Sequence, residues 1–137
     1  MDGILSYIID ALYSLPGILV GLSFHEWGHA YAAYKRGDPT ARNLGRMTVN
    51  PLAHIDPLGF LSLLILGFGW AKPVPVDPRY FRKPKQGMAI TALAGPVSNF
   101  LLALVLLLIA RGVYLRALVT GQLSETWFSF LLNTASL

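Results

Sequence analysis

His25, Glu26 and His29 form the motif HEWGH in an otherwise apolar stretch of the chain. In an α-helix, His25 and His29 project from one face, one turn apart, and two imidazoles placed in this way can bind one zinc ion. Glu26 adjoins that face, where a carboxylate can act as general base toward a zinc-bound water. Ionisable side chains are costly inside a membrane and by default mark a functional site there. The spacing therefore predicts a zinc site with His25 and His29 as metal ligands and Glu26 as catalytic base.

The composition indicates that this helix lies in a membrane. Of the 137 residues, 54% are hydrophobic and only 13% are charged, whereas soluble domains carry about 25% charged residues. The chain has no cysteine, so disulfides and thiolate metal sites are excluded. Its net charge of +4 comes from basic residues placed between apolar runs, which is typical of membrane topology signals and gives no support for nucleic-acid binding. We predict an all-α integral membrane protein with a single membrane-embedded domain over residues 1–137.

Four segments are apolar enough to enter the bilayer. Residues 16–35 and 88–114 are long enough to cross it, and 127–137 reads as the start of another span. Residues 58–71 are shorter and predict a re-entrant segment or a short span. Ser14 and Pro16 predict a helix start, with residues 2–13 either a separate interfacial helix or an extension of the same one.

The polar stretch between the two clear spans is expected to contain non-helical backbone. A short strand is predicted at 46–49, and the alternating prolines of GWAKPVPV force extended backbone near 70–76. Such backbone is tolerated at membrane depth only against protein or a water-filled cavity. The segment is either an unpaired edge that pairs with an unwound substrate strand or a plain buried turn.

The basic residues predict the orientation. If 58–71 enters the membrane and returns, nine of them share one side, which the positive-inside rule makes cytoplasmic. These nine are Lys35, Arg36, Arg42, Arg46, Lys72, Arg79, Arg82, Lys83 and Lys85. We therefore expect a multi-pass protein of the cell membrane with its site toward the cytoplasmic side.

Three further motifs follow the HExxH motif in order: NPLAHIDPLG, GWAKPVPV and AGPVSN. Together they resemble the site-2 protease family of intramembrane zinc metalloproteases, in particular the compact bacterial members without a PDZ domain. The resemblance implies hydrolysis of peptide bonds within or next to transmembrane segments, with transmembrane proteins as substrates and Zn²⁺ as cofactor. It also implies that His25 and His29 bind the zinc and that Glu26 is the base.

One element of the family pattern is missing. The family takes its third zinc ligand from an Asp in a later Leu-Asp-Gly motif, which this sequence lacks. A catalytic zinc needs three protein ligands, so we expect either that the chain is truncated at its C-terminus and the ligand lies beyond Leu137, or that His54 or Asp56 of HIDP substitutes. The ordinary interpretation of His54 and Asp56 is a turn.

Two other functions remain open at this stage. A non-catalytic membrane scaffold or substrate-binding homologue would keep the fold with an incomplete metal site, and a metal transporter would use the histidines transiently. Gly95 and Asn99, four residues apart on the second clear span with Ala94 and Ser98 beside them, indicate close helix packing in all three cases.

Overall fold

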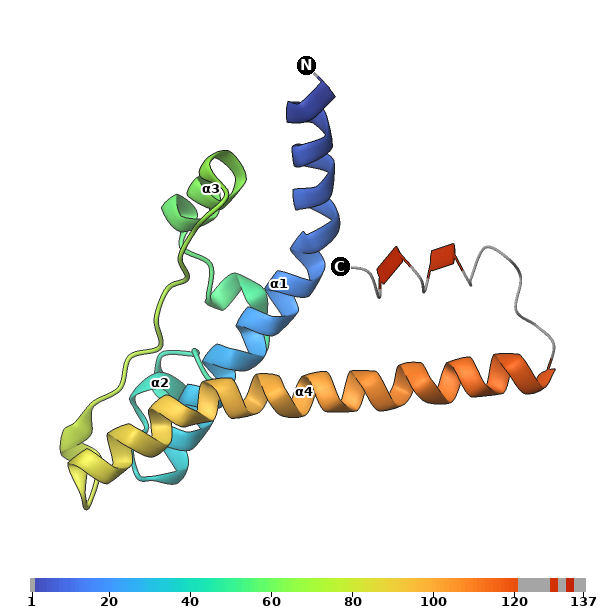
Figure 1. The fold of residues 1–137 in the computed structure, drawn as a ribbon. Helices are drawn as coiled ribbons and strands as arrows, with labels where there is room; N and C mark the ends of the chain where they lie inside the picture. The colour runs from blue at the N-terminus through green and yellow to red at the C-terminus, as the bar shows by residue number, and fades with distance from the viewer. Residues whose placement is uncertain (1, 121–128, 131–132, 135–137) are drawn as a thin grey trace. The chain divides into compact units, whose positions relative to one another are not determined.

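The computed structural model describes residues 2–120, 129–130 and 133–134, and within them the regular elements are helices joined by turns and extended loops. The elements are α1 (Asp2–Lys35), α2 (Thr40–Asn43), the 3₁₀ helix η1 (Pro51–Ala53), α3 (Pro57–Leu66), the 3₁₀ helix η2 (Pro78–Tyr80) and α4 (Pro84–Thr120) (Figure 1). The chain divides into two units, residues 1–102 and 103–137, and α4 runs across the boundary. The site described below lies wholly in the first unit. The predicted span at 127–137 falls mostly outside the described residues.

The described part of the chain contains no strand, so the expected all-α class is confirmed there and the strand predicted at 46–49 is wrong. Backbone groups of this segment are paired with side chains instead. The Thr48 carbonyl accepts from His54 Nε2 at 2.7 Å, and the Asn50 N–H donates to Thr48 Oγ1 at 3.1 Å. A strand needs a neighbouring strand to pair with, and none lies beside this segment within the described residues.

α1 is one continuous helix of 34 residues, longer than the predicted span. The predicted helix start near Ser14 and Pro16 is wrong, because residues 2–13 extend the same helix. Ser14 does not cap a helix start; its hydroxyl donates to the Ala11 carbonyl at 3.0 Å. Pro16 lies inside the helix, and proline is more frequent in transmembrane helices than in helices of soluble proteins.

α1 and α4 are both long and apolar enough to cross a membrane. None of the residues in the apolar window of α1 is buried, and only 6% of those in the window of α4 are. A core helix of a soluble protein would bury most of such a surface. These side chains therefore need an apolar solvent, which a bilayer provides.

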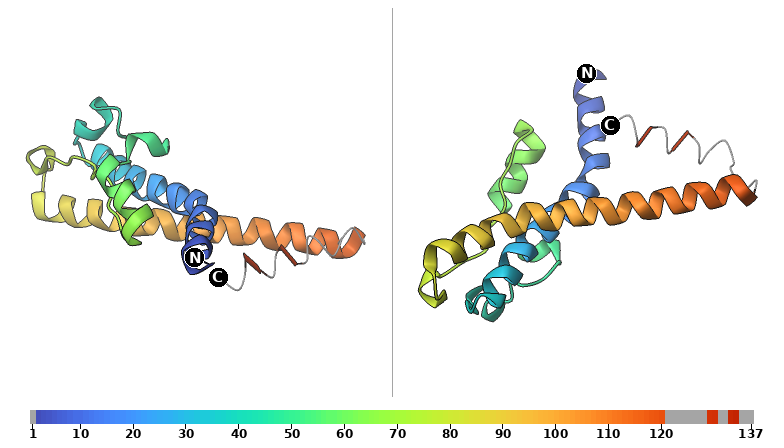
Figure 2. Two further views of the ribbon diagram at one scale, coloured as in Figure 1. Left: turned by 90° about the horizontal axis from the view of Figure 1, so that it is seen from above. Right: turned by 60° about the horizontal axis from the view of Figure 1, so that its bottom comes forward.

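α3 and the segment after it form a hairpin in which the chain turns back on itself. Asp56 caps α3 by accepting from the N–H groups of Leu58 and Gly59 at 2.9 and 3.2 Å, and the helix ends at Gly67 in a left-handed conformation with φ 81°. The extended chain then returns beside α3, as Figures 1 and 2 both show, and Ser62 Oγ donates to the Phe68 carbonyl at 2.9 Å.

An isolated antiparallel bridge between Ile55 and Ala71 closes this hairpin, so the chain enters and leaves it at one place. The Lys72 N–H donates to the His54 carbonyl at 2.9 Å and reinforces the closure. A hairpin closed in this way can enter a membrane and return to the same side, so the re-entrant segment stays a prediction.

Candidate metal centre

His25 and His29 lie on one face of α1 with their Nε2 atoms 3.1 Å apart. Two nitrogens bound to one tetrahedral zinc at 2.0–2.1 Å are separated by about 3.3 Å. The observed separation is within a few tenths of an ångström of that value. The two Nε2 atoms are therefore close enough together for both to reach one zinc ion.

A backbone group of α4 orients His29. The carbonyl of Thr91 lies 2.6 Å from His29 Nδ1, and since a carbonyl only accepts, Nδ1 carries the proton. The lone pair is then on Nε2, the atom that faces His25. Metal-binding histidines usually have such a partner on the other ring nitrogen, which fixes both tautomer and ring orientation.

A glycine of α4 makes room for the imidazoles. A Cβ added to Gly95 would lie 2.5 Å from His29 Nε2 and 2.8 Å from His25 Nε2. A Cβ added to Gly28 of α1 would likewise lie too close to Ser98 and to the Ala94 carbonyl. The close helix packing predicted for these small residues is therefore confirmed, and at Gly95 it directly adjoins the metal-binding atoms.

Glu26 is 9% exposed and is held by the chain segment that follows the hairpin. Its Oε2 accepts from the N–H of Val74 at 3.2 Å, so the proline-rich segment positions this carboxylate. The ligand atoms of His25, Glu26 and His29 lie within 4.8 Å of one another, and they form the one such group found among the described residues. Imidazole nitrogens suit zinc, and the carboxylate lies close enough to act beside a bound metal.

His54 and Asp56 are not part of this group. His54 is fully buried, its Nε2 bonds the Thr48 carbonyl, and its Nδ1 has no partner in the described part of the chain. Asp56 caps α3. Both residues therefore have structural roles in the loop, as the turn interpretation expects. The Oδ1 atom of Asn99 is buried and likewise lacks a hydrogen-bond partner among the residues described.

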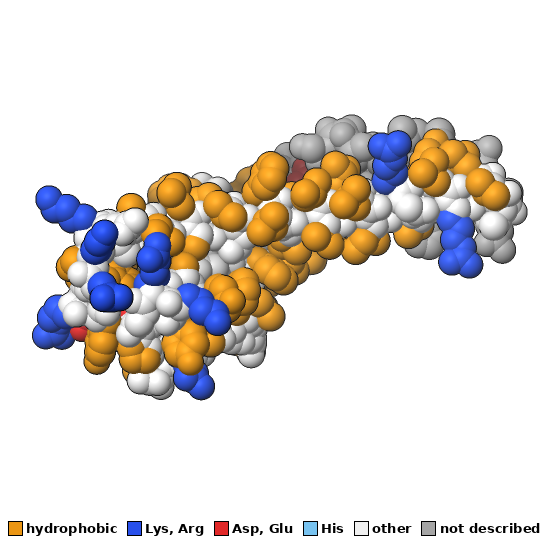
Figure 3. All heavy atoms as spheres, turned by 90° about the horizontal axis from the view of Figure 1, so that it is seen from below, with side chains coloured by type: hydrophobic (Ala, Val, Ile, Leu, Met, Phe, Trp, Pro, Cys, Tyr) orange, Lys and Arg blue, Asp and Glu red, His pale blue; other side chains and the backbone are white. Residues whose placement is uncertain are grey.

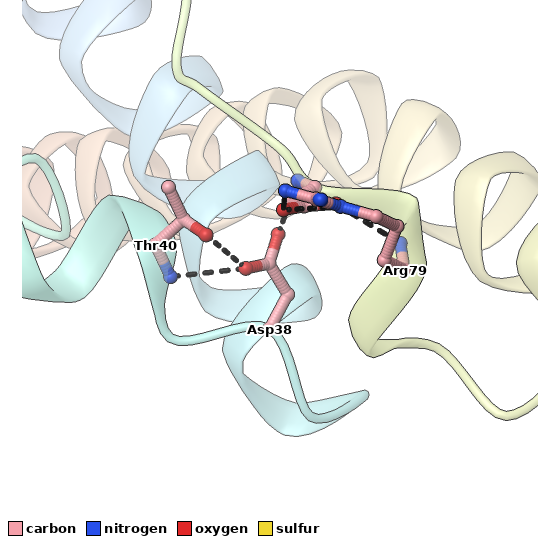
Figure 4. Close-up of polar contacts among 4 residues, drawn as sticks. Asp38, Thr40 and Arg79 are labelled. Atoms are coloured by element: carbon pink, nitrogen blue, oxygen red, sulfur yellow. Dashed lines mark hydrogen bonds and ion pairs between the residues drawn. The ribbon is translucent and has the colours of Figure 1, made fainter.

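Sequence reasoning missed Asp38, which ties the end of α1 to the segment before α4. This carboxylate is fully buried, and its Oδ1 accepts from the backbone N–H and the hydroxyl of Thr40 at 3.0 and 2.5 Å (Figure 4). Its Oδ2 accepts from the N–H of Asp77 at 2.7 Å. The signal available in the sequence was Asp-Pro-Thr, since Asp favours such local side-chain to backbone turns.

Asp77 in turn pairs with Arg79 at the start of η2. The guanidinium donates to both carboxylate oxygens, with Nη2 at 2.8 Å from Oδ2. Hydrogen bonds from the side chain and the backbone N–H of Arg79 lower the pKa of Asp77. The Asp77 carboxylate, which caps η2, therefore stays charged down to a lower pH.

Comparison of the sequence with curated proteins finds relatives that are named as putative zinc metalloproteases. The chain is 45% identical over 106 residues to "Putative zinc metalloprotease YwhC" of Bacillus subtilis, a match that covers 77% of this chain and 48% of that protein. It is 32% identical over 115 residues to "Putative zinc metalloprotease Rip2" of Mycolicibacterium smegmatis, covering 80% of this chain and 44% of Rip2. The Rip2 protein of Mycobacterium tuberculosis is 31% identical over 102 residues, 71% of this chain and 39% of that protein.

The chain thus spans about half the length of the curated relatives it matches, or somewhat less. No family model matches it, and no solved structure does. The two long apolar helices are typical of a membrane protein, and over most of its own length the chain is similar to putative zinc metalloproteases. This similarity supports the resemblance drawn from its four motifs.

Proposed function

We propose that this chain forms part of a zinc-dependent intramembrane endopeptidase that hydrolyses peptide bonds within or next to transmembrane segments of membrane proteins. The observation that carries the proposal is the convergence of two imidazole Nε2 atoms and one buried carboxylate on an apolar helix. The relatives are named as putative zinc metalloproteases, which supports both zinc binding and proteolysis.

The residues of the site have different roles. His25 and His29 hold the metal, and the Thr91 carbonyl keeps His29 in the tautomer that leaves Nε2 free to bind. When bound, zinc supplies Lewis acidity to the scissile carbonyl and to an attacking water. Glu26 uses one oxygen to accept the Val74 N–H, so its other oxygen is available to take a proton from that water and pass it to the leaving amine.

Three features support a multi-pass arrangement with the site toward the cytoplasm. α1 and α4 are each long and apolar enough to cross the membrane. The bridge between Ile55 and Ala71 returns the hairpin to its starting point. The nine basic residues before and after the hairpin then share one side, as the positive-inside rule requires for cytoplasmic loops.

The test is Glu26→Gln in the protein expressed in its own membrane with a panel of tagged single-span membrane proteins. The amide oxygen of Gln can still accept the Val74 N–H, so fold and zinc content are expected to stay unchanged. Loss of a general base typically costs about 10²–10⁴-fold in rate, so cleavage products on an immunoblot should disappear.

Asp10→Asn is the matched control, because Asp10 is an exposed carboxylate of the same helix outside the site. It should leave cleavage unchanged. His29→Ala should lower the zinc content measured by mass spectrometry of the metal. Unchanged cleavage in Glu26→Gln would refute the proteolytic assignment, and unchanged zinc in His29→Ala would refute the metal site.

A further inference from the structure

A second site is built where α1 ends and α4 begins. A cavity of about 370 Å³ lies between these two segments. Four cationic side chains line it, two from each segment, together with Phe81, Gln86 and Gly87; the cations are Lys35, Arg36, Arg82 and Lys83. Figure 3 shows Lys and Arg side chains gathered over this part of the first unit.

No acidic residue lines this cavity. Within the described part of the chain the one ion pair is between Asp77 and Arg79, so none of the four cations is neutralised by a carboxylate. Four like charges around one cavity repel one another in the absence of an anion. An anionic group in the cavity would relieve this repulsion.

The start of α4 adds hydrogen-bond donors to the same place. Pro84 has no N–H, and the N–H groups of Lys85 and Gln86 have no acceptor among the described residues. The first turn of α4 contains no acidic side chain. Free N–H groups at the positive end of a long helix bind phosphate and other anions.

Phe81 keeps the cavity in shape. It is only 5% exposed and packs against Gly87, where an added Cβ would lie 2.5 Å from the Phe81 ring. Phe81 is therefore a closely packed apolar part of the lining, and most of the other lining residues are cationic. The volume is at the lower end of the range for small-molecule sites, which is about 300–1,000 Å³, and exceeds what one phosphate ion requires.

We propose that this cavity binds the phosphate and headgroup of an anionic phospholipid at the membrane surface. The position favours a lipid over a soluble phosphate ester, because the cavity lies at the polar ends of both helices long enough to cross a membrane. Met88 and Tyr31, each 41% exposed, continue from it along these helices as apolar surface for acyl chains. The proposal does not depend on zinc binding or proteolysis.

The experiment titrates the detergent-purified protein with phosphatidylglycerol and, separately, phosphatidylcholine, and counts bound lipids by native mass spectrometry. Phosphatidylglycerol should bind on the order of tenfold more tightly than phosphatidylcholine. The double variant Arg82→Gln/Lys83→Gln should lose this preference. Arg111→Gln/Arg116→Gln removes the same charge from exposed positions in the second unit and should keep it.

A further variant separates binding from folding. Gln86→Glu is nearly isosteric and adds an acid to the first turn of α4, where it favours the helix. It should leave thermal stability unchanged or raised while weakening phosphatidylglycerol binding.

Four results would overturn the proposal. The first is equal affinity for the two lipids in the unaltered protein. The second is equal loss of preference in both double variants. The third is unweakened phosphatidylglycerol binding in Gln86→Glu. The fourth is inorganic phosphate that binds as tightly as phosphatidylglycerol and displaces it, since the cavity would then be a site for soluble phosphate.

Discussion

Gly95→Ala has two opposing effects: it favours the helix, and it introduces a clash with the metal-binding imidazoles. Alanine is a better helix former than glycine by about 1 kcal/mol, so the helix alone would be stabilised. The new Cβ would lie 2.5 Å from His29 Nε2, whereas ordinary contacts begin at 3.4 Å, so the imidazole must move by about 0.9 Å. Zinc sites tolerate about 0.2 Å in their ligand distances.

We therefore expect Gly95→Ala to weaken zinc binding by about 10–100-fold, the range found when the support of a metal ligand is lost. The assay is competition with a chromogenic chelator on the purified protein, with helix content followed by circular dichroism. The helix content should stay the same or increase slightly, so that the loss of zinc cannot be assigned to unfolding.

Gly112→Ala is the matched control, because it lies in the same helix and an added Cβ there meets nothing within 4 Å. It should keep full zinc affinity. If Gly95→Ala binds zinc as tightly as Gly112→Ala does, the imidazoles are not held against α4 and the reasoning about the site is refuted.

Two other predictions concern the segment between α1 and α4. Asp38→Asn turns one acceptor oxygen of a fully buried carboxylate into an NH₂ donor that faces N–H groups. It should therefore lower the free energy of unfolding by about 1–3 kcal/mol, measured by thermal unfolding. The control Asp56→Asn keeps a residue that caps a helix and should change stability little. Arg79→Gln should raise the pKa of Asp77 toward its ordinary value in an NMR titration. Because the pKa of Asp77 is lowered in the folded chain, its pairing with Arg79 stabilises the fold above the unfolded-state pKa, and this stabilisation is lost as the pH falls through the lowered pKa. An unchanged Asp77 pKa in Arg79→Gln would show that the Arg79 side chain does not cause the shift.

The sequence by itself determined those features that depend on one helix. The spacing of His25 and His29 places them on one face because the helical period is local, and the structure brings their Nε2 atoms together as expected. The apolar composition predicted the membrane helices, because the need for an apolar solvent follows from side-chain type alone. The end of α3 near Gly67 also follows local chemistry, since glycine favours the left-handed conformation found there.

Only the tertiary structure decided how these elements support the site. The bond from His29 to Thr91 joins residues 62 apart in the sequence, and the bond from Val74 to Glu26 joins residues 48 apart. The predicted strand at 46–49 was wrong for the same reason, since a strand depends on a partner elsewhere in the chain. The cationic cavity likewise arises where the end of α1 meets the start of α4. Contacts of this kind depend on how distant segments pack, and residue spacing carries no information about that.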